Sequence, residues 1–126
     1  MTPNTFRGLA LGFPGAVESA HMNHSDFRVA GKVFATLGYP DDAWAMIKLT
    51  PEKQQSFVRD AAPAFRPCKG VWGQRGATNV HLASATEAQV RSALEASLQA
   101  VTLKTEKSSR RRPREPQVKI DRRARR

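Results

Sequence analysis

The chain has 126 residues, of which 40% are hydrophobic and 25% charged, which predicts one folded domain and excludes a fully disordered protein. Its net charge is +10, yet residues 1–103 hold 10 basic and 8 acidic side chains while residues 104–126 hold 11 and 3, so the excess charge lies almost entirely at the C-terminal end. No run of about 18 apolar residues is present, and the N-terminal residues lack the pattern of a secretion signal, so we expect neither membrane spanning nor export.

The first half of the domain predicts a helix followed by a hairpin. A helix is expected over residues 2–13, where apolar residues recur at helical spacing. Polar residues 19–25 predict a loop. Alternating residues 26–30 and the apolar run 33–37 predict two strands joined by a turn at Gly31-Lys32.

A third strand is expected over residues 43–49, where apolar and polar side chains alternate. One face would carry Ala45, Ile47 and Leu49, and the other Trp44, Met46 and Lys48. A second helix is predicted over residues 51–62, since Thr50 is a good N-cap, Pro51 fits the first helical position and Pro63 ends it.

The last third of the domain predicts a second hairpin and a final helix. Residues 71–73 and 79–83 are expected to be strands around a glycine-rich turn at 74–77. Either Ser84 with Glu87 or Thr86 with Gln89 forms a capping box that opens a helix whose apolar stripe runs from Val90 to Val101.

The order α-β-β-β-α-β-β-α predicts a single two-layer α+β domain over residues 1–103, with an antiparallel-rich sheet of about five strands and three helices on one face. Residues 104–126 contain few large apolar side chains. We therefore expect them to form a disordered, basic tail.

Several short motifs in the sequence resemble those of the MmcQ/YjbR family, both in residue type and in their spacing along the chain. They are Asp26-Phe27-Arg28, Gly31-Lys32, the run Trp44 to Leu49 with its helix start, and Trp72-Gly73, within a resemblance that extends from Phe6 to Val101. The resemblance implies a frataxin-like (CyaY-like) fold and DNA binding by a "double wing" of two β-hairpins. It implies no catalytic residues. Ser25, where similar sequences often have proline, and the long basic tail depart from the family pattern.

Basic side chains supply the candidate nucleic-acid contacts, because arginine and lysine displace counterions from phosphate. In the tail the candidates are Arg110, Arg111, Arg112, Arg114, Arg122 and Arg123; in the domain they are Arg28, Lys32, Lys48, Arg66, Lys69 and Arg75. Lys32 and Arg75 are expected at the two hairpin tips. The competing interpretation is a tail that only solubilises the protein.

Trp44, Met46 and His81 are candidates for stacking on bases or for an interface, since we expect them on the open face of the sheet together with Arg28. The alternative is that Trp44 and Met46 lie under a loop or in a dimer contact.

The sequence gives little support for a metal site, a cofactor site or a catalytic cysteine. His21 and His24 have the spacing H-x-x-H but no third ligand nearby, and residues 2–13 lack carboxylates for iron, so no metal or other cofactor is expected. Cys68 is the single cysteine, which favours a reducing, cytoplasmic location and offers no thiolate partner for catalysis.

The sequence thus predicts a non-enzymatic, cytoplasmic protein that binds nucleic acid, DNA more than RNA, with low sequence specificity. We expect a monomer or weak homodimer, with neither a membrane nor a small-molecule substrate as partner. The alternative function is a protein-interaction or homodimerisation module that uses the open sheet face.

Overall fold

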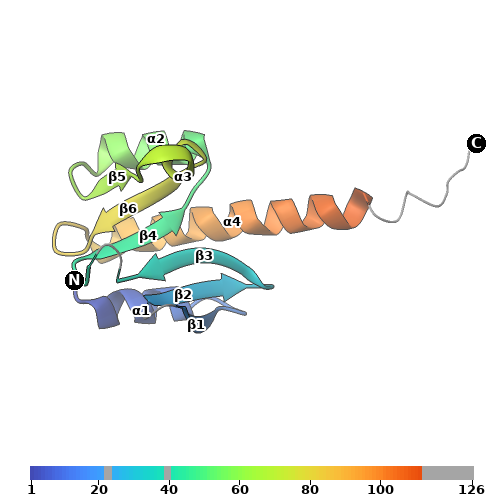
Figure 1. Ribbon diagram of the computed structural model, residues 1–126, viewed down its shortest axis with the longest axis horizontal. Helices are drawn as coiled ribbons and strands as arrows, with labels where there is room; N and C mark the ends of the chain where they lie inside the picture. Colours follow the sequence, from blue (N-terminus) through green and yellow to red (C-terminus); the bar gives the residue numbers. More distant parts are fainter. Residues whose placement is uncertain (22–23, 39–40, 112–126) are drawn as a thin grey trace, which may run out of the picture.

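The protein folds as one antiparallel sheet whose helices cover a single face (Figure 1). The computed structural model describes residues 1–21, 24–38 and 41–111. Its strands are β1 (Val17–His21), β2 (His24–Val29), β3 (Lys32–Leu37), β4 (Trp44–Lys48), β5 (Phe65–Pro67) and β6 (Ala77–His81), and its helices are α1 (Pro3–Leu11), α2 (Pro51–Asp60), α3 (Gly70–Gln74) and α4 (Glu87–Arg111). The α+β class predicted from the sequence is confirmed. The sheet, in the order β1-β2-β3-β4-β6-β5, has six strands rather than about five.

The core fills the space between the sheet and the helices. Ala45, Ile47 and Leu49 of the third predicted strand are buried, as their alternation indicated. Phe6 of α1 meets Phe27 of β2 edge-on, with ring centroids 6.0 Å apart. The sequence prediction of a one-sided sheet is therefore correct.

Strand β1 replaces part of the loop that we predicted over residues 19–25. It pairs with β2 from Val17↔Arg28 to His21↔His24 and forms one edge of the sheet. The prediction was wrong because β1 is exposed along its described side chains, so no apolar alternation marks it.

The second predicted hairpin is also wrong. Residues 71–73, expected to be a strand, lie in the short helix α3, and the strand that pairs with β6 is β5. Pro67 ends β5, which lies at a sheet edge, where proline costs no ladder hydrogen bond on its outer side. The additional helix, α3, lies where the sequence analysis predicted a strand, and the additional strand, β1, lies partly where it predicted a loop.

Both long helices begin at side-chain caps. The Thr50 hydroxyl oxygen accepts a hydrogen bond from the Lys53 amide at 3.2 Å and starts α2. At α4 the capping box is Thr86 with Gln89: each side chain accepts from the other's amide, at 3.0 and 3.1 Å. Of the two boxes that the sequence allowed, the one at Ser84 is not used for this cap.

Helix α4 is longer than predicted. We expected the disordered tail to begin at residue 104, but α4 continues to Arg111, so residues 104–111 are helical in the structure. At 1.5 Å per residue its 25 residues span about 37 Å. The sequence analysis placed the boundary where large apolar side chains become rare, although no proline follows until Pro113.

Candidate functional site

The antiparallel topology gives the sheet two distinct ends. Strands β2, β4 and β5 finish at one end, where β3 and β6 begin, and the opposite holds at the other end. Connections between strands therefore gather their side chains at one end or the other, wherever they stand in the sequence.

Half of the ten basic side chains of residues 1–103 lie at one end. The residues of this basic end are Lys32, Lys48, Lys53, Lys69 and Arg75. Of these, Lys48 is half-buried and the other four are exposed. The carboxylates at this end are Glu52 in α2 and Glu18 in β1, and Glu18 forms an ion pair with Arg7 at 3.1 Å. The sequence had proposed four of the five basic residues as candidates, and the fold brings those four to one end.

Half of the eight acidic side chains of residues 1–103 lie at the other end. The residues of this acidic end are Asp41, Asp42, Asp60 and Glu87. Asp60 is paired with Arg59, whose Nε lies 3.0 Å from Oδ1. The nearly neutral charge of residues 1–103 thus conceals a separation of charge along the strand direction.

Helix α4 leaves the sheet at the basic end (Figure 1). Its first turns lie near the acidic end, after β6, and the Ser97 hydroxyl donates to the Phe34 carbonyl in β3 at 3.1 Å. The backbone then carries positions Arg110 and Arg111 beyond the sheet. The remaining tail candidates, Arg112, Arg114, Arg122 and Arg123, lie outside the described residues.

Lys32, Lys69 and Arg75 occupy exposed positions next to turns. Lys32 starts β3 after a tight turn in which Ala30 and Gly31 both have positive φ, 53° and 78°, as hairpin turns of this kind require. Lys69 directly precedes α3 and Arg75 directly follows it. Arg75 therefore lies at a helix end and not at the hairpin tip that we predicted.

Trp44, Met46, Lys48 and His81 share the open face, as predicted from strand parity. Trp44 lies opposite His81 in the β4–β6 ladder, with ring centroids 4.9 Å apart, and the Arg66 guanidinium carbon lies 4.8 Å from the indole centroid. This distance is within cation–π range. The half-buried Trp44 ring is thus engaged by two side chains of its own sheet, so it offers little free ring surface to a ligand.

Arg28 also lies on the open face but is committed to Asp26. Its Nε and Nη2 donate to the two carboxylate oxygens at 2.9 and 3.2 Å, and Asp26 is buried. The hydrogen bonds and charge of Asp26 raise the pKa of Arg28 above its ordinary value. A phosphate would have to compete with this two-point contact.

Besides Lys53, the sequence analysis missed Trp72 as a candidate. Trp72 and its neighbour Val71 are 64% and 57% exposed on α3. Because we expected a strand there, we attached no role to the tryptophan. The glycines at 70, 73 and 76 were the available signal, since they favour a tight turn over a strand.

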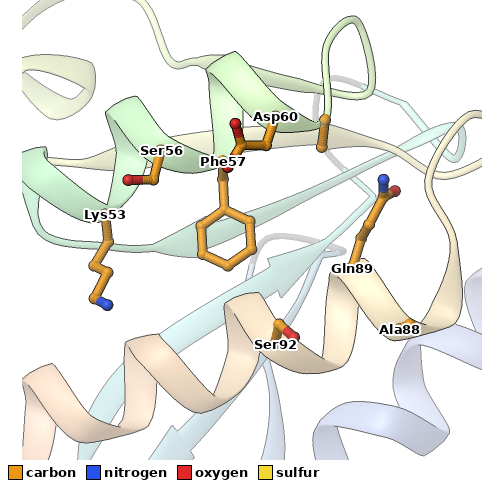
Figure 2. Close-up of a pocket in the computed structure, with 8 residues that line it drawn as sticks. Lys53, Ser56, Phe57, Asp60, Ala88, Gln89 and Ser92 are labelled. Carbon is orange, nitrogen blue, oxygen red and sulfur yellow. The ribbon is translucent and has the colours of Figure 1, made fainter.

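A groove of about 420 Å³ separates α2 from α4 (Figure 2). Phe57 points from α2 toward α4 at its centre, and Ser56, Gln89 and Ser92 add polar groups. Its ionisable residues, Lys53 and Asp60, are separated by about two helical turns. No nucleophile and base converge in this groove, and within the described parts of the chain no three metal-ligating side chains come together.

Cys68 is half-buried beside β6. Its thiol donates to Oδ1 of Asn79 at 3.2 Å, and burial raises the pKa of the thiol. The protonated form is therefore favoured, which suits a structural thiol rather than a nucleophile.

Comparisons with known proteins agree with this architecture. A family model described as YjbR matches residues 11–100. The crystal structure of Deinococcus radiodurans protein DR2400, with the domain DUF419, is similar at a TM-score of 0.67 and 16% sequence identity, over 80% of this chain and 78% of that one. At this identity the likeness shows the fold alone. No curated protein matches the sequence. Among the described helices, none is long and apolar enough to cross a membrane.

Proposed function

This chain belongs to the YjbR family, and we propose that it is a non-enzymatic, cytoplasmic protein that binds nucleic acid, DNA in preference to RNA, with low sequence specificity. The observation that carries the proposal is the distribution of charge. Residues 104–126 add 11 basic and 3 acidic side chains, and α4, which includes residues 104–111, leaves the sheet at the basic end.

The basic end would supply orientation. Lys32 on the β2–β3 hairpin and Arg75 beside α3 project from two separate elements, so together they can straddle a phosphate backbone as two wings would. Contacts of this kind fix the position of a duplex without reading its sequence. Low specificity follows, because contacts to phosphate carry no sequence information.

The tail would supply affinity. Each phosphate that a lysine or arginine neutralises releases condensed counterions, and the logarithm of the binding constant then falls with the logarithm of salt concentration at about −0.9 per phosphate. If about five phosphates are neutralised, the slope is roughly −4 to −5.

The test is a salt titration of the full chain and of a variant with Arg112, Arg114, Arg122 and Arg123 changed to Gln. Random-sequence DNA and RNA duplexes serve as ligands, each measured by fluorescence anisotropy at several salt concentrations. We expect tighter binding to DNA and, for the variant, weaker binding with a slope less negative by about 3 to 4. Equal affinities and equal slopes for the two proteins would refute the role of the tail.

A further inference from the structure

Trp72 is the most exposed large apolar side chain in the described part of the chain, at 64%. Tryptophan has the largest apolar surface of any residue and is normally well covered in a monomer. Within the described residues, its ring makes no stacking or cation–π contact, whereas Trp44 is engaged by His81 and Arg66. An exposed, unengaged indole requires an explanation.

The backbone beneath Trp72 is tightly fixed. A Cβ at Gly73 would lie 1.7 Å from the Cys68 carbonyl oxygen, and a Cβ at Gly76 would lie 1.8 Å from that of Leu49. The buried Gln54 amide donates to the carbonyls of Gly73 and Ala77, each at 2.9 Å. Helix α3 is thus packed closely against α2 and against the residues that directly follow β4 and β5, so it presents the indole from a rigid support.

The charges around Trp72 select the partner. Residues 61–86 contain Arg66, Lys69 and Arg75 and not a single aspartate or glutamate. Lys69 and Arg75 are exposed at the two ends of α3, so the indole lies between two cations. A second copy of this chain docking through the same surface would bring like charges together, whereas a polyanion would neutralise them.

We propose that Trp72 is a stacking platform for an unpaired base of single-stranded nucleic acid, with Lys69 and Arg75 contacting the flanking phosphates. This inference rests on the proposed function and narrows its ligand. A paired base inside a duplex has both faces covered by its neighbours, while an unpaired base offers a free face to the indole. Stacking of this kind tolerates any base, in keeping with low specificity.

The two tryptophans allow a direct spectroscopic test. In Trp44→Phe the remaining indole is Trp72, and in Trp72→Phe it is Trp44. Each full-length protein is titrated with an unlabelled oligothymidylate while its tryptophan emission is recorded. Binding of the same oligonucleotide is measured separately by calorimetry. We expect strong quenching of Trp72 emission at saturation and little change for Trp44. Saturable binding without quenching of Trp72 overturns the inference.

Affinity provides the second measurement. We expect Trp72→Ala to weaken binding of the single strand by about tenfold and to leave duplex binding within about twofold. Val17→Ala is the matched control, since Val17 is 57% exposed on β1, at the opposite edge of the sheet, and it should change neither.

Each other result has a distinct meaning. Unchanged single-strand affinity in Trp72→Ala, together with salt-dependent binding that the tail substitutions weaken, refutes the stacking site and leaves the proposed function standing. An equal loss on duplex and single strand refutes the preference for unpaired bases. A concentration-dependent dimer in sedimentation velocity that Trp72→Ala abolishes assigns the indole to self-association and overturns the inference. If the nucleic-acid affinity of the full chain did not change with salt concentration, the proposed function itself would be refuted.

Discussion

Gly73 and Gly76 determine how closely α3 approaches the sheet. Gly73 lies against the backbone of Cys68, and Gly76, at φ +111°, lies against the backbone of Leu49. Both contacts are with backbone atoms, which cannot turn aside as a flexible side chain can. Their packing explains why the segment turns as a short helix, although Val71 and Trp72 favour a strand by composition.

We predict that Gly73→Ala lowers the free energy of unfolding by about 2 to 4 kcal/mol, because a methyl group there must displace the Cys68 carbonyl. Chemical denaturation measures the change. Gly8→Ala is the control: Gly8 is in α1, and an added Cβ would have no atom within 4 Å. That substitution should raise stability by up to about 1 kcal/mol, and equal effects of the two substitutions would contradict the account.

We predict that the thiol of Cys68 reacts slowly in the folded protein. Burial raises its pKa, so less thiolate is present at a given pH than for an exposed cysteine. Alkylation at pH 7.5 should be several-fold faster in urea than in buffer, and the lone cysteine makes the readout unambiguous. Because the folded state holds this proton more tightly, stability should decline as pH rises past the unfolded thiol pKa of about 8.5. Equal alkylation rates would refute the burial argument.

At the level of elements, the starts of the helices α2 and α4 could be predicted from the sequence, whereas the strands β1 and β5 could not. Thr50-Pro51 and the Thr86–Gln89 pair follow local rules, so the sequence located α2 and α4. The described side chains of β1 are all exposed, so they form no apolar alternation, and β5 has only three residues, ending in proline. Their pairing depends on neighbours distant in sequence, which local periodicity cannot report.

The cap of α4 gives an element-scale prediction. Thr86→Ala removes the acceptor for the Gln89 amide and should lower the free energy of unfolding by about 1 kcal/mol. Ser92→Ala, an exposed substitution further along the same helix, should be neutral or slightly stabilising, because alanine is the better helix former. Thermal melts followed by circular dichroism compare the two. A Thr86 variant as stable as wild type would show that the capping box contributes nothing.

At the level of the whole molecule, the candidate site depends on topology. The sequence identified Lys32, Lys48, Lys69 and Arg75 one at a time, from local patterns, but not their position at one end of the sheet. That position follows from the strand order β4-β6-β5, which includes an edge strand that the sequence analysis did not find. The two tryptophans likewise differ through tertiary contacts: Trp44 is covered by His81 and Arg66 of the sheet, whereas Trp72 is exposed. Local sequence does not indicate which indole is covered.

We propose that the position of the basic side chains at one end of the sheet, and not net charge alone, directs this protein to nucleic acid. The measurement is the salt dependence of duplex binding for two full-length variants of equal net charge, Lys32→Gln/Arg75→Gln at the basic end and Arg59→Gln/Arg91→Gln near the acidic end. We predict that the first pair weakens binding and makes the slope less negative by about 2, while the second leaves the slope unchanged. Equal losses in both variants, or a loss only in the second, would contradict the account.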